Sequence, residues 1–143
     1  MAIKQLSVFA ENKRGSVYET LNALANEHID VRALSIADTM DFGILRLIVS
    51  DLEKAVNLLK DKGTVVSVTD VIGVQMPNVP GGLAKILALL AEKDINIEYM
   101  YAFIATVKEN AYVVLRVANN ELAEQALKDA GMVLLAQEDI NNL

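Results

Sequence analysis

The feature that most constrains the fold of this chain is an internal repeat. Residues 7–37, SVFAENKRGSVYETLNALANEHIDVRALSIA, align with residues 73–103, GVQMPNVPGGLAKILALLAEKDINIEYMYAF, at a constant offset of 66. In this alignment Asn12 meets Asn78 and Gly15 meets Gly81, and several apolar positions coincide as well. A repeat of this kind predicts that one structural unit occurs twice. We therefore expect two units, residues 1–69 and 70–143.

Both halves have the same order of predicted elements, β-α-β-β-α-β, which is the ferredoxin-like arrangement. Right-handed crossovers place both helices of such a unit on one face of a four-stranded antiparallel sheet, so the predicted fold class is α+β. Gly63 and Gly131 follow helical patterns, where a left-handed backbone commonly ends a helix. The predicted strands are 3–9, 30–37, 43–49, 64–68, 71–76, 95–105, 111–118 and 132–137, and the predicted helices are 16–27, 51–62, 81–93 and 120–130.

Composition excludes several classes of function. The chain has 143 residues, no cysteine and one histidine, so cysteine catalysis, thiolate zinc sites and histidine metal clusters are not expected. The net charge is −6 and the basic residues are scattered, which argues against nucleic acid or an anionic membrane as a partner. Lys85 interrupts the most apolar stretch, which is too short to span a bilayer. We expect a cytoplasmic protein without metal, cofactor or catalytic residues.

Three charged residues are candidates for function. His28 aligns with Asp94, so the unit does not require a histidine there, and we interpret His28 as a surface residue at a helix C-terminus. Arg46 and Arg116 recur on corresponding predicted strands. We interpret them as outer-face arginines with solvated heads, and the alternative is that they pair with a carboxylate.

The predicted strand 95–105 is apolar on both faces, whereas a sheet with one face in water should alternate. The second face is therefore expected to be covered, most simply by another copy of the chain. We predict a homodimer.

One further feature is the loop between the first strand and first helix of each unit, ENKRGS and PNVPGGL. A helix N-terminus presents unsatisfied N–H groups, and glycines allow a carboxylate to approach them. Such a loop suits a small anionic or zwitterionic ligand. The alternative is that asparagine caps the helix and glycine makes a tight turn, and the residues alone leave both interpretations open.

The pattern N-x-P-G-x-L-x-x-I-x-x-L, followed by I-N-I, resembles the ACT domain, a ligand-binding regulatory module. In the second unit the match is carried by Asn78, Pro80, Gly81, Leu83, Ile86, Leu90 and Ile95 to Ile97. The first unit is a weaker copy, because Arg14 stands where the proline would be. The chain as a whole resembles a stand-alone pair of ACT domains without an attached enzyme.

The resemblance implies that a free amino acid binds where the first-helix loop of one unit meets the second strand of its neighbour. It also implies that the two units pair into an eight-stranded sheet with four helices on one face. One implied site combines Asn78, Val79, Pro80, Gly81, Gly82 and Leu83 with Leu34, Ser35 and Ile36. Its counterpart combines Asn12, Lys13, Arg14, Gly15, Ser16 and Val17 with Tyr99, Met100 and Tyr101. Arg14 leaves open whether a chain has one site or two.

From these features we expect a non-catalytic sensor that regulates a metabolic enzyme in trans. The amides of Gly81, Gly82 and Leu83 are expected to bind the carboxylate, and Asn78 the ammonium group. Two alternatives remain. One is a dimerisation module without a ligand, and the other is an acylphosphatase-like hydrolase that uses Arg14 and Asn12, although the second unit lacks the arginine.

Overall fold

The computed structural model describes residues 2–11, 13–38, 42–104 and 109–143. The chain forms two compact units. Lys4–Thr69 make up the first unit, and Asp70–Leu143 with the N-terminal residues through Ile3 make up the second. Ile3 belongs with the second unit because its side chain packs beside Gly73, where an added Cβ atom would lie 3.1 Å from Ile3 Cδ1.

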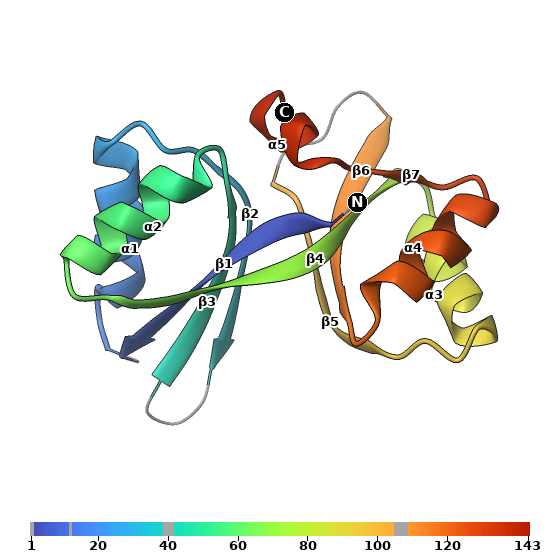
Figure 1. Ribbon diagram of the computed structural model, residues 1–143, viewed down its shortest axis with the longest axis horizontal. Coiled ribbons are helices and arrows are strands. Elements are labelled where there is room, and N and C mark those ends of the chain that lie inside the picture. The colour runs from blue at the N-terminus through green and yellow to red at the C-terminus, as the bar shows by residue number, and fades with distance from the viewer. Residues whose placement is uncertain (1, 12, 39–41, 105–108) are drawn as a thin grey trace. The chain divides into compact units, whose positions relative to one another are not determined.

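The first unit contains the predicted order of elements. It consists of β1 (Ile3–Glu11), α1 (Ser16–Asn26), β2 (Val31–Asp38), β3 (Phe42–Val49), α2 (Leu52–Asp61) and the beginning of β4 (Val65–Pro77). β3 pairs antiparallel with both β1 and β2, with Leu47 opposite Leu6 and Leu34. Both helices lie on one face of the sheet (Figure 1). Leu6, Val8, Leu24 and Leu47 are fully buried between the sheet and the helices.

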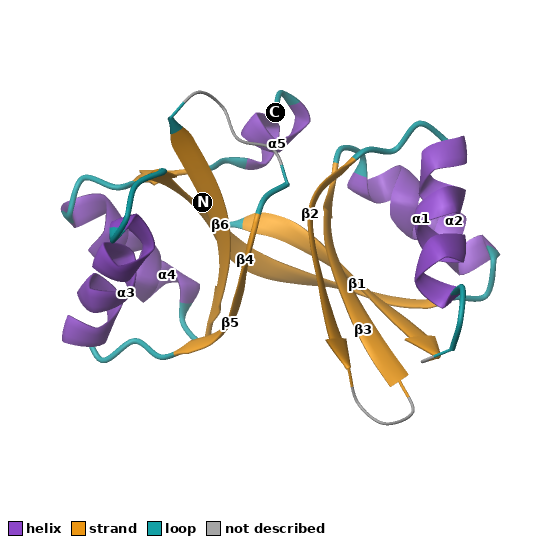
Figure 2. Ribbon diagram, turned by 180° about the vertical axis from the view of Figure 1, so that it is seen from behind, coloured by secondary structure: helices purple, strands orange, loops and turns teal. Residues whose placement is uncertain are grey.

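The second unit repeats this architecture. It consists of the rest of β4, α3 (Gly82–Glu92), β5 (Ile97–Ala102), β6 (Asn110–Val117), α4 (Asn120–Asp129), β7 (Val133–Leu134) and α5 (Gln137–Asn141). β4 pairs antiparallel with β6 on one side and β7 on the other, and β5 pairs with β6. Figure 2 shows α3 and α4 on one face of this sheet. The element order of both halves confirms the predicted fold class, α+β with two ferredoxin-like units in tandem.

The repeat predicts which residues form the two cores. Val74 and Leu90, the counterparts of Val8 and Leu24, are also fully buried. Gly63 and Gly131 have φ angles of +77° and +80°, so the predicted left-handed helix ends are confirmed. His28 and Asp94 occupy the same position after α1 and α3, with φ angles of +58° and +56°. His28 therefore ends α1 through its backbone, and its N–H donates to the Ala25 carbonyl at 3.0 Å.

Three differences from the predicted elements exceed two residues. The strands expected at 64–68 and 71–76 form one strand, β4. The two residues between them are Thr69 and Asp70, and neither is a glycine or proline that would turn the chain. β7 has two residues, and the chain then enters the short helix α5, which the periodicity did not predict. The Asp139 carboxylate accepts the Ala136 N–H at 2.7 Å, and buried Ile140 anchors α5. β5 ends at Ala102, and residue 105 of the expected strand lies outside the described part of the chain.

Candidate functional site

Both glycines at the start of α3 have a structural cause. Gly81 is the N-cap residue and has a φ of +86°, a conformation that favours glycine. At Gly82 a Cβ atom would lie 2.5 Å from the Pro77 carbonyl oxygen, so a side chain has no room there. The first unit has the same N-cap conformation at Gly15, with a φ of +85°, but Ser16 follows it. The first loop also has its own hydrogen bond, from the Lys13 N–H to the Glu11 carbonyl at 2.9 Å.

The two kinds of helix in each unit begin differently. In α2 the Asp51 side chain accepts the Lys54 N–H, and in α4 the Asn119 side chain accepts the Leu122 N–H, both at 3.1 Å. Among the residues that the structure describes, no side chain caps α1 or α3. The interpretation that Asn78 caps α3 is therefore wrong. Asn78 instead donates its backbone N–H to the Glu109 carbonyl at 2.8 Å.

One of the amides predicted to bind a carboxylate already has a partner in the loop. The Gly82 N–H donates to the Val79 carbonyl at 3.1 Å. Leu83 packs partly buried against the core of the second unit. The start of α3 therefore combines an internally bonded turn with a helix terminus that no described side chain caps.

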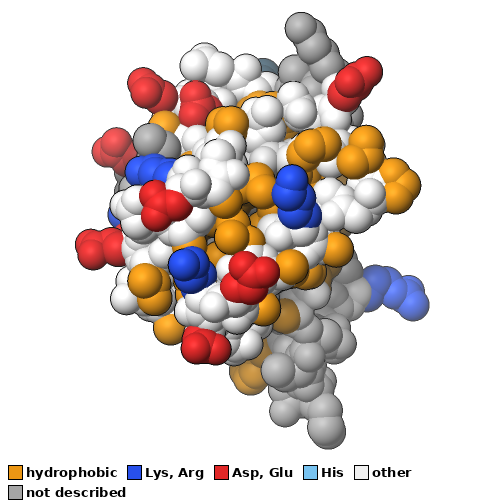
Figure 3. All heavy atoms as spheres, turned by 90° about the vertical axis from the view of Figure 1, so that its right-hand side faces the viewer, with side chains coloured by type: hydrophobic (Ala, Val, Ile, Leu, Met, Phe, Trp, Pro, Cys, Tyr) orange, Lys and Arg blue, Asp and Glu red, His pale blue; other side chains and the backbone are white. Residues whose placement is uncertain are grey.

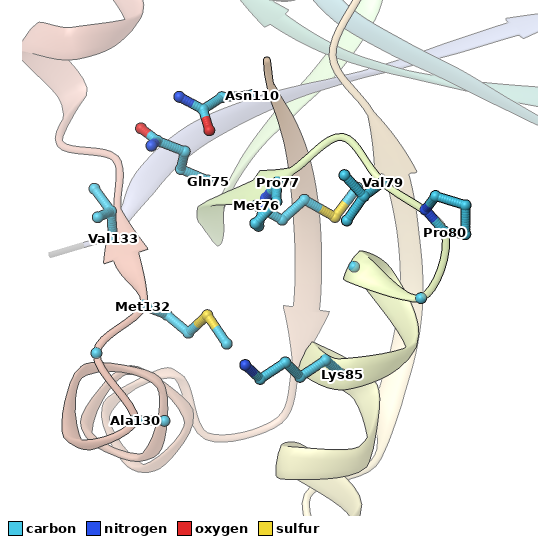
Figure 4. A pocket seen from close by; sticks show the side chains of 13 residues that line it. Gln75, Met76, Pro77, Val79, Pro80, Lys85, Asn110, Ala130, Met132 and Val133 are labelled. Atoms are coloured by element: carbon cyan, nitrogen blue, oxygen red, sulfur yellow. The ribbon is translucent and has the colours of Figure 1, made fainter.

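A cavity of about 480 Å³ lies beside this loop, within the second unit (Figure 4). Ligand pockets in proteins typically enclose about 300–1,000 Å³. Lys85 extends into it from α3 toward Met132, and Met76 lies between them and the loop. The lining residues are Gln75, Met76, Pro77, Val79, Pro80, Gly81, Gly82, Lys85, Asn110, Ala130, Gly131, Met132 and Val133. Figure 3 shows this side of the molecule, where hydrophobic side chains gather among scattered charges.

The first unit has a cavity of about 410 Å³ at the equivalent place. Its lining includes Ser16, Glu19 and Thr64, which correspond to Gly82, Lys85 and Met132. A second cavity of about 230 Å³ lies on the other side of the first loop and is lined by Lys13, Ser16, Val17, Ile36 and four further residues. Ile36 thus lies beside the first-helix loop of its own unit.

The predicted site residues fall into several groups. Val79 to Gly82 line the larger cavity, while Asn78 and Arg14 are exposed and Asn12 lies outside the described residues. Leu34, Ser35 and Ile36 lie on β2 of the first unit, whereas Tyr99, Met100 and Tyr101 lie on β5 of the second. Both implied groupings join a loop of one unit to a strand of the other, and they stay predictions.

Sequence reasoning missed several residues that line the larger cavity, Gln75, Met76, Lys85, Asn110 and Met132. Lys85 had a signal in the sequence, because it follows the glycines by one helical turn and aligns with an acidic residue, Glu19. Met132 and Asn110 had none, since they come close to the loop only when the chain folds.

Arg116, one of the two candidate arginines, has partners within its own unit. Arg116 donates to the Asp70 carbonyl at 3.2 Å, and its Nε lies 3.5 Å from a Glu98 carboxylate oxygen. The Arg116 guanidinium is therefore paired, whereas the sequence predicted that it is only solvated.

Across the ranges that the structure describes, no three His, Cys, Asp or Glu side chains are grouped so that they could hold a metal ion. None of the described helices is long and apolar enough to cross a membrane.

Together, these features define a tandem α+β protein in which the first helix of each unit opens on a left-handed glycine. A family model described as "ACT domain pair" matches residues 1–143. The chain therefore belongs to the ACT domain pair family.

Solved structures include a similar protein over the whole chain. Protein BT0572 from Bacteroides thetaiotaomicron is 46% identical with a TM-score of 0.92, covering 100% of this chain and 98% of that one. The regulatory subunit of aspartate kinase from Thermus thermophilus is 19% identical with a TM-score of 0.65, covering 89% and 91%. The corresponding subunit from Thermus flavus is 19% identical with a TM-score of 0.59, covering 90% and 92%. The Thermus proteins show the shared fold alone. No match was found among curated proteins.

Proposed function

We propose that this chain is a non-catalytic sensor, which binds a free amino acid and regulates a metabolic enzyme in trans. The observation that carries the proposal is the start of α3. It opens on Gly81 without a side-chain cap from any described residue, beside a cavity of about 480 Å³. The second helix of each unit has a side-chain cap, so the fold does not require bare helix starts in general.

The chemistry of the loop supports an amino acid as ligand. The amides of Gly81 and Leu83 are directed to the carboxylate, which the partial positive charge of the helix N-terminus stabilises. The Asn78 side chain is an acceptor for the ammonium group. The proposal includes Leu34, Ser35 and Ile36 as the strand that completes the site. The counterpart is the Lys13–Val17 loop with Asn12 and the strand Tyr99–Tyr101.

Binding between two units provides a mechanism of regulation. A ligand that contacts both units favours one mutual arrangement, and its effect is limited by its differential affinity for the two arrangements, about 1–3 kcal/mol. By analogy of fold alone, a chain of paired ACT units is the regulatory subunit in the Thermus proteins. We place this chain in the cytoplasm, beside the enzyme it regulates.

Thermal melting in the presence of each of the twenty amino acids tests the proposal. A ligand at about 100 times its Kd stabilises the folded chain by about 2.7 kcal/mol and raises its Tm. Gly81→Val is expected to abolish this shift, because a β-branched residue strains the left-handed N-cap conformation on which the exposed amides depend. The matched control is Gly63→Val, which has a similar backbone strain at a φ of +77° but lies at the end of α2, outside both predicted sites.

The two alternatives predict other results. If no amino acid raises the Tm at millimolar concentration, the sensor proposal fails and the chain is an interaction module. Hydrolysis of an acyl phosphate that is lost in Arg14→Ala would establish the hydrolase.

A further inference from the structure

The two equivalent cavities differ in charge at one position. Lys85 is the fourth residue of α3 and lines the cavity of the second unit, and Glu19 is the fourth residue of α1 and lines the cavity of the first. The repeat therefore exchanges a cation for an anion at the same place in the same fold.

The remaining charges strengthen this difference. Lys85 is the one charged residue among the described residues that line the second-unit cavity. The first-unit cavity is lined by Glu11, Glu19, Lys13 and Lys62, and Lys13 Nζ lies 3.4 Å from a Glu11 carboxylate oxygen. The formal charge of the lining is thus +1 in the second unit and zero in the first. In the second-unit cavity, Lys85 therefore has no acidic residue beside it in the described lining, and its charge is available to pair with an acidic ligand.

The apolar lining differs in the same direction. Met76 and Met132 of the second-unit cavity correspond to Ala10 and Thr64 in the first. Methionine side chains adapt their shape to an apolar group. In Figure 4 the side chains of Lys85 and Met132 extend toward one another, while Met76 extends toward Val79; since all three line this cavity, one ligand can contact a cation and two thioethers together. Gln75 and Asn110, on β4 and β6, supply amide groups for a further polar atom.

We propose that the second-unit cavity binds a small carboxylic acid with an apolar body, whose carboxylate pairs with Lys85 and whose body contacts Met76 and Met132. The equivalent cavity of the first unit does not bind this ligand, so each chain has one such site. The inference deepens the proposed sensor function and rests on it: the ligand bound at the Gly81 loop is an apolar carboxylic acid, whose body extends into the second-unit cavity and whose carboxylate pairs with Lys85 beside the Gly81 amide.

Isothermal titration calorimetry at constant ionic strength tests the inference with three sets of probes. The first set is leucine, methionine and valine, the second is the same molecules without the amino group, and the third is the same molecules without the carboxylate. Amino acids and deaminated acids are expected to bind with one ligand per chain, whereas the amines do not bind. Lys85→Gln is expected to weaken binding by about 10- to 100-fold, because a charge-assisted hydrogen bond is lost.

The matched control is Lys62→Gln, which removes the same charge from the first-unit cavity and is expected to leave the affinity unchanged. Amide NMR spectra provide a readout that does not depend on stability. Chemical shifts are expected to change at Lys85 and Met132 and to stay unchanged at Glu19 and Thr64.

The possible failures are distinguishable. If an amino acid binds Lys85→Gln as tightly as the wild type, or if two bind per chain, the cavity inference is overturned while amino-acid sensing stands. If deaminated acids bind through Lys85 but no amino acid does, the cavity inference stands and the sensor proposal fails. If no apolar acid or amino acid binds, the cavity inference is overturned, and melting with all twenty amino acids decides the sensor proposal separately.

Discussion

At the scale of single residues, the start of α3 depends on two glycines for two different reasons. Gly81 is needed for its positive φ, and open space surrounds the place where its Cβ would lie. Gly82 has no such backbone requirement, but its Cβ would lie 2.5 Å from a carbonyl oxygen and 3.7 Å from the carbonyl carbon of Pro77. A backbone carbonyl in a strand cannot rotate away as a side chain can, so the clash has to be relieved by moving the loop.

Gly82→Ala is therefore expected to lower the free energy of unfolding by about 1–3 kcal/mol, the usual cost of overpacking. Alanine's better helix propensity offsets only part of this loss. Urea denaturation measures the change. The control is Gly43→Ala, whose Cβ meets the Ala37 carbonyl oxygen at an ordinary 3.9 Å, and its stability is expected to stay within about 0.5 kcal/mol of wild type. A Gly82→Ala protein as stable as the wild type would show that the loop adapts without cost.

At the scale of elements, the four main helices form two classes that alternate along the chain. α1 and α3 begin at left-handed glycines, and α2 and α4 begin at the side-chain caps Asp51 and Asn119. A capping side chain satisfies one of the free N–H groups of the first turn. In α2 and α4 a side chain thus accepts a backbone N–H of the first turn. In α1 and α3 no described side chain does so, and the corresponding N–H groups are available to a ligand.

Replacing a cap tests this division. Asp51→Ala is expected to reduce stability by about 1 kcal/mol, because the Lys54 N–H loses its acceptor at 3.1 Å. Asp51→Asn keeps an acceptor oxygen and should stay close to the wild type in the same denaturation measurement. Equal losses in both variants would mean that the charge of Asp51, and not the cap, is what stabilises α2.

Prediction from sequence succeeded at this scale wherever periodicity continues over two or more helical turns or several strand residues. The helices α1 to α4 follow from the spacing of apolar residues such as Leu24 and Leu90. α5 has five residues and one buried apolar residue, Ile140, which is too little for a periodic signal. The junction in β4 was missed because strand continuation and strand termination look alike when no glycine or proline marks the turn.

At the scale of the whole molecule, the apolar strand near residue 100 leaves part of its surface uncovered. β5 is the edge strand of the second unit; its Met100 is 40% exposed, and Ile104, two residues beyond its end, is 61% exposed. An edge strand with exposed apolar side chains is a surface on which another chain can pair. The other face of the strand was expected to be covered by a second copy, but Tyr101 and Phe103 are already buried within the chain, at 9% and 7% exposure. The homodimer therefore stays a prediction, and the exposed edge at β5 is the surface we propose for it.

We expect light scattering after gel filtration to give about 31 kDa, twice the chain mass of 15.6 kDa. Ile104→Glu is expected to shift this mass toward the monomer, because it places a charge in the proposed interface. Leu122→Glu serves as control, since it places the same charge at a similarly exposed leucine, 53% exposed on α4 and outside β5. A wild-type mass of 15.6 kDa at micromolar concentration would exclude a stable homodimer.

The amino-acid sequence by itself determined the repeat, the order of the elements and the glycine at which α3 begins. These features depend on local periodicity and on backbone conformations that particular residues prefer. The tertiary structure alone decided why Gly82 is a glycine and which side chains share the cavity. Pro77, Lys85 and Met132 come from β4, α3 and the segment after α4, and only the packing of these elements brings them together. The reason for the second glycine, Gly82, is therefore a contact with Pro77 across the fold, which a linear sequence does not contain.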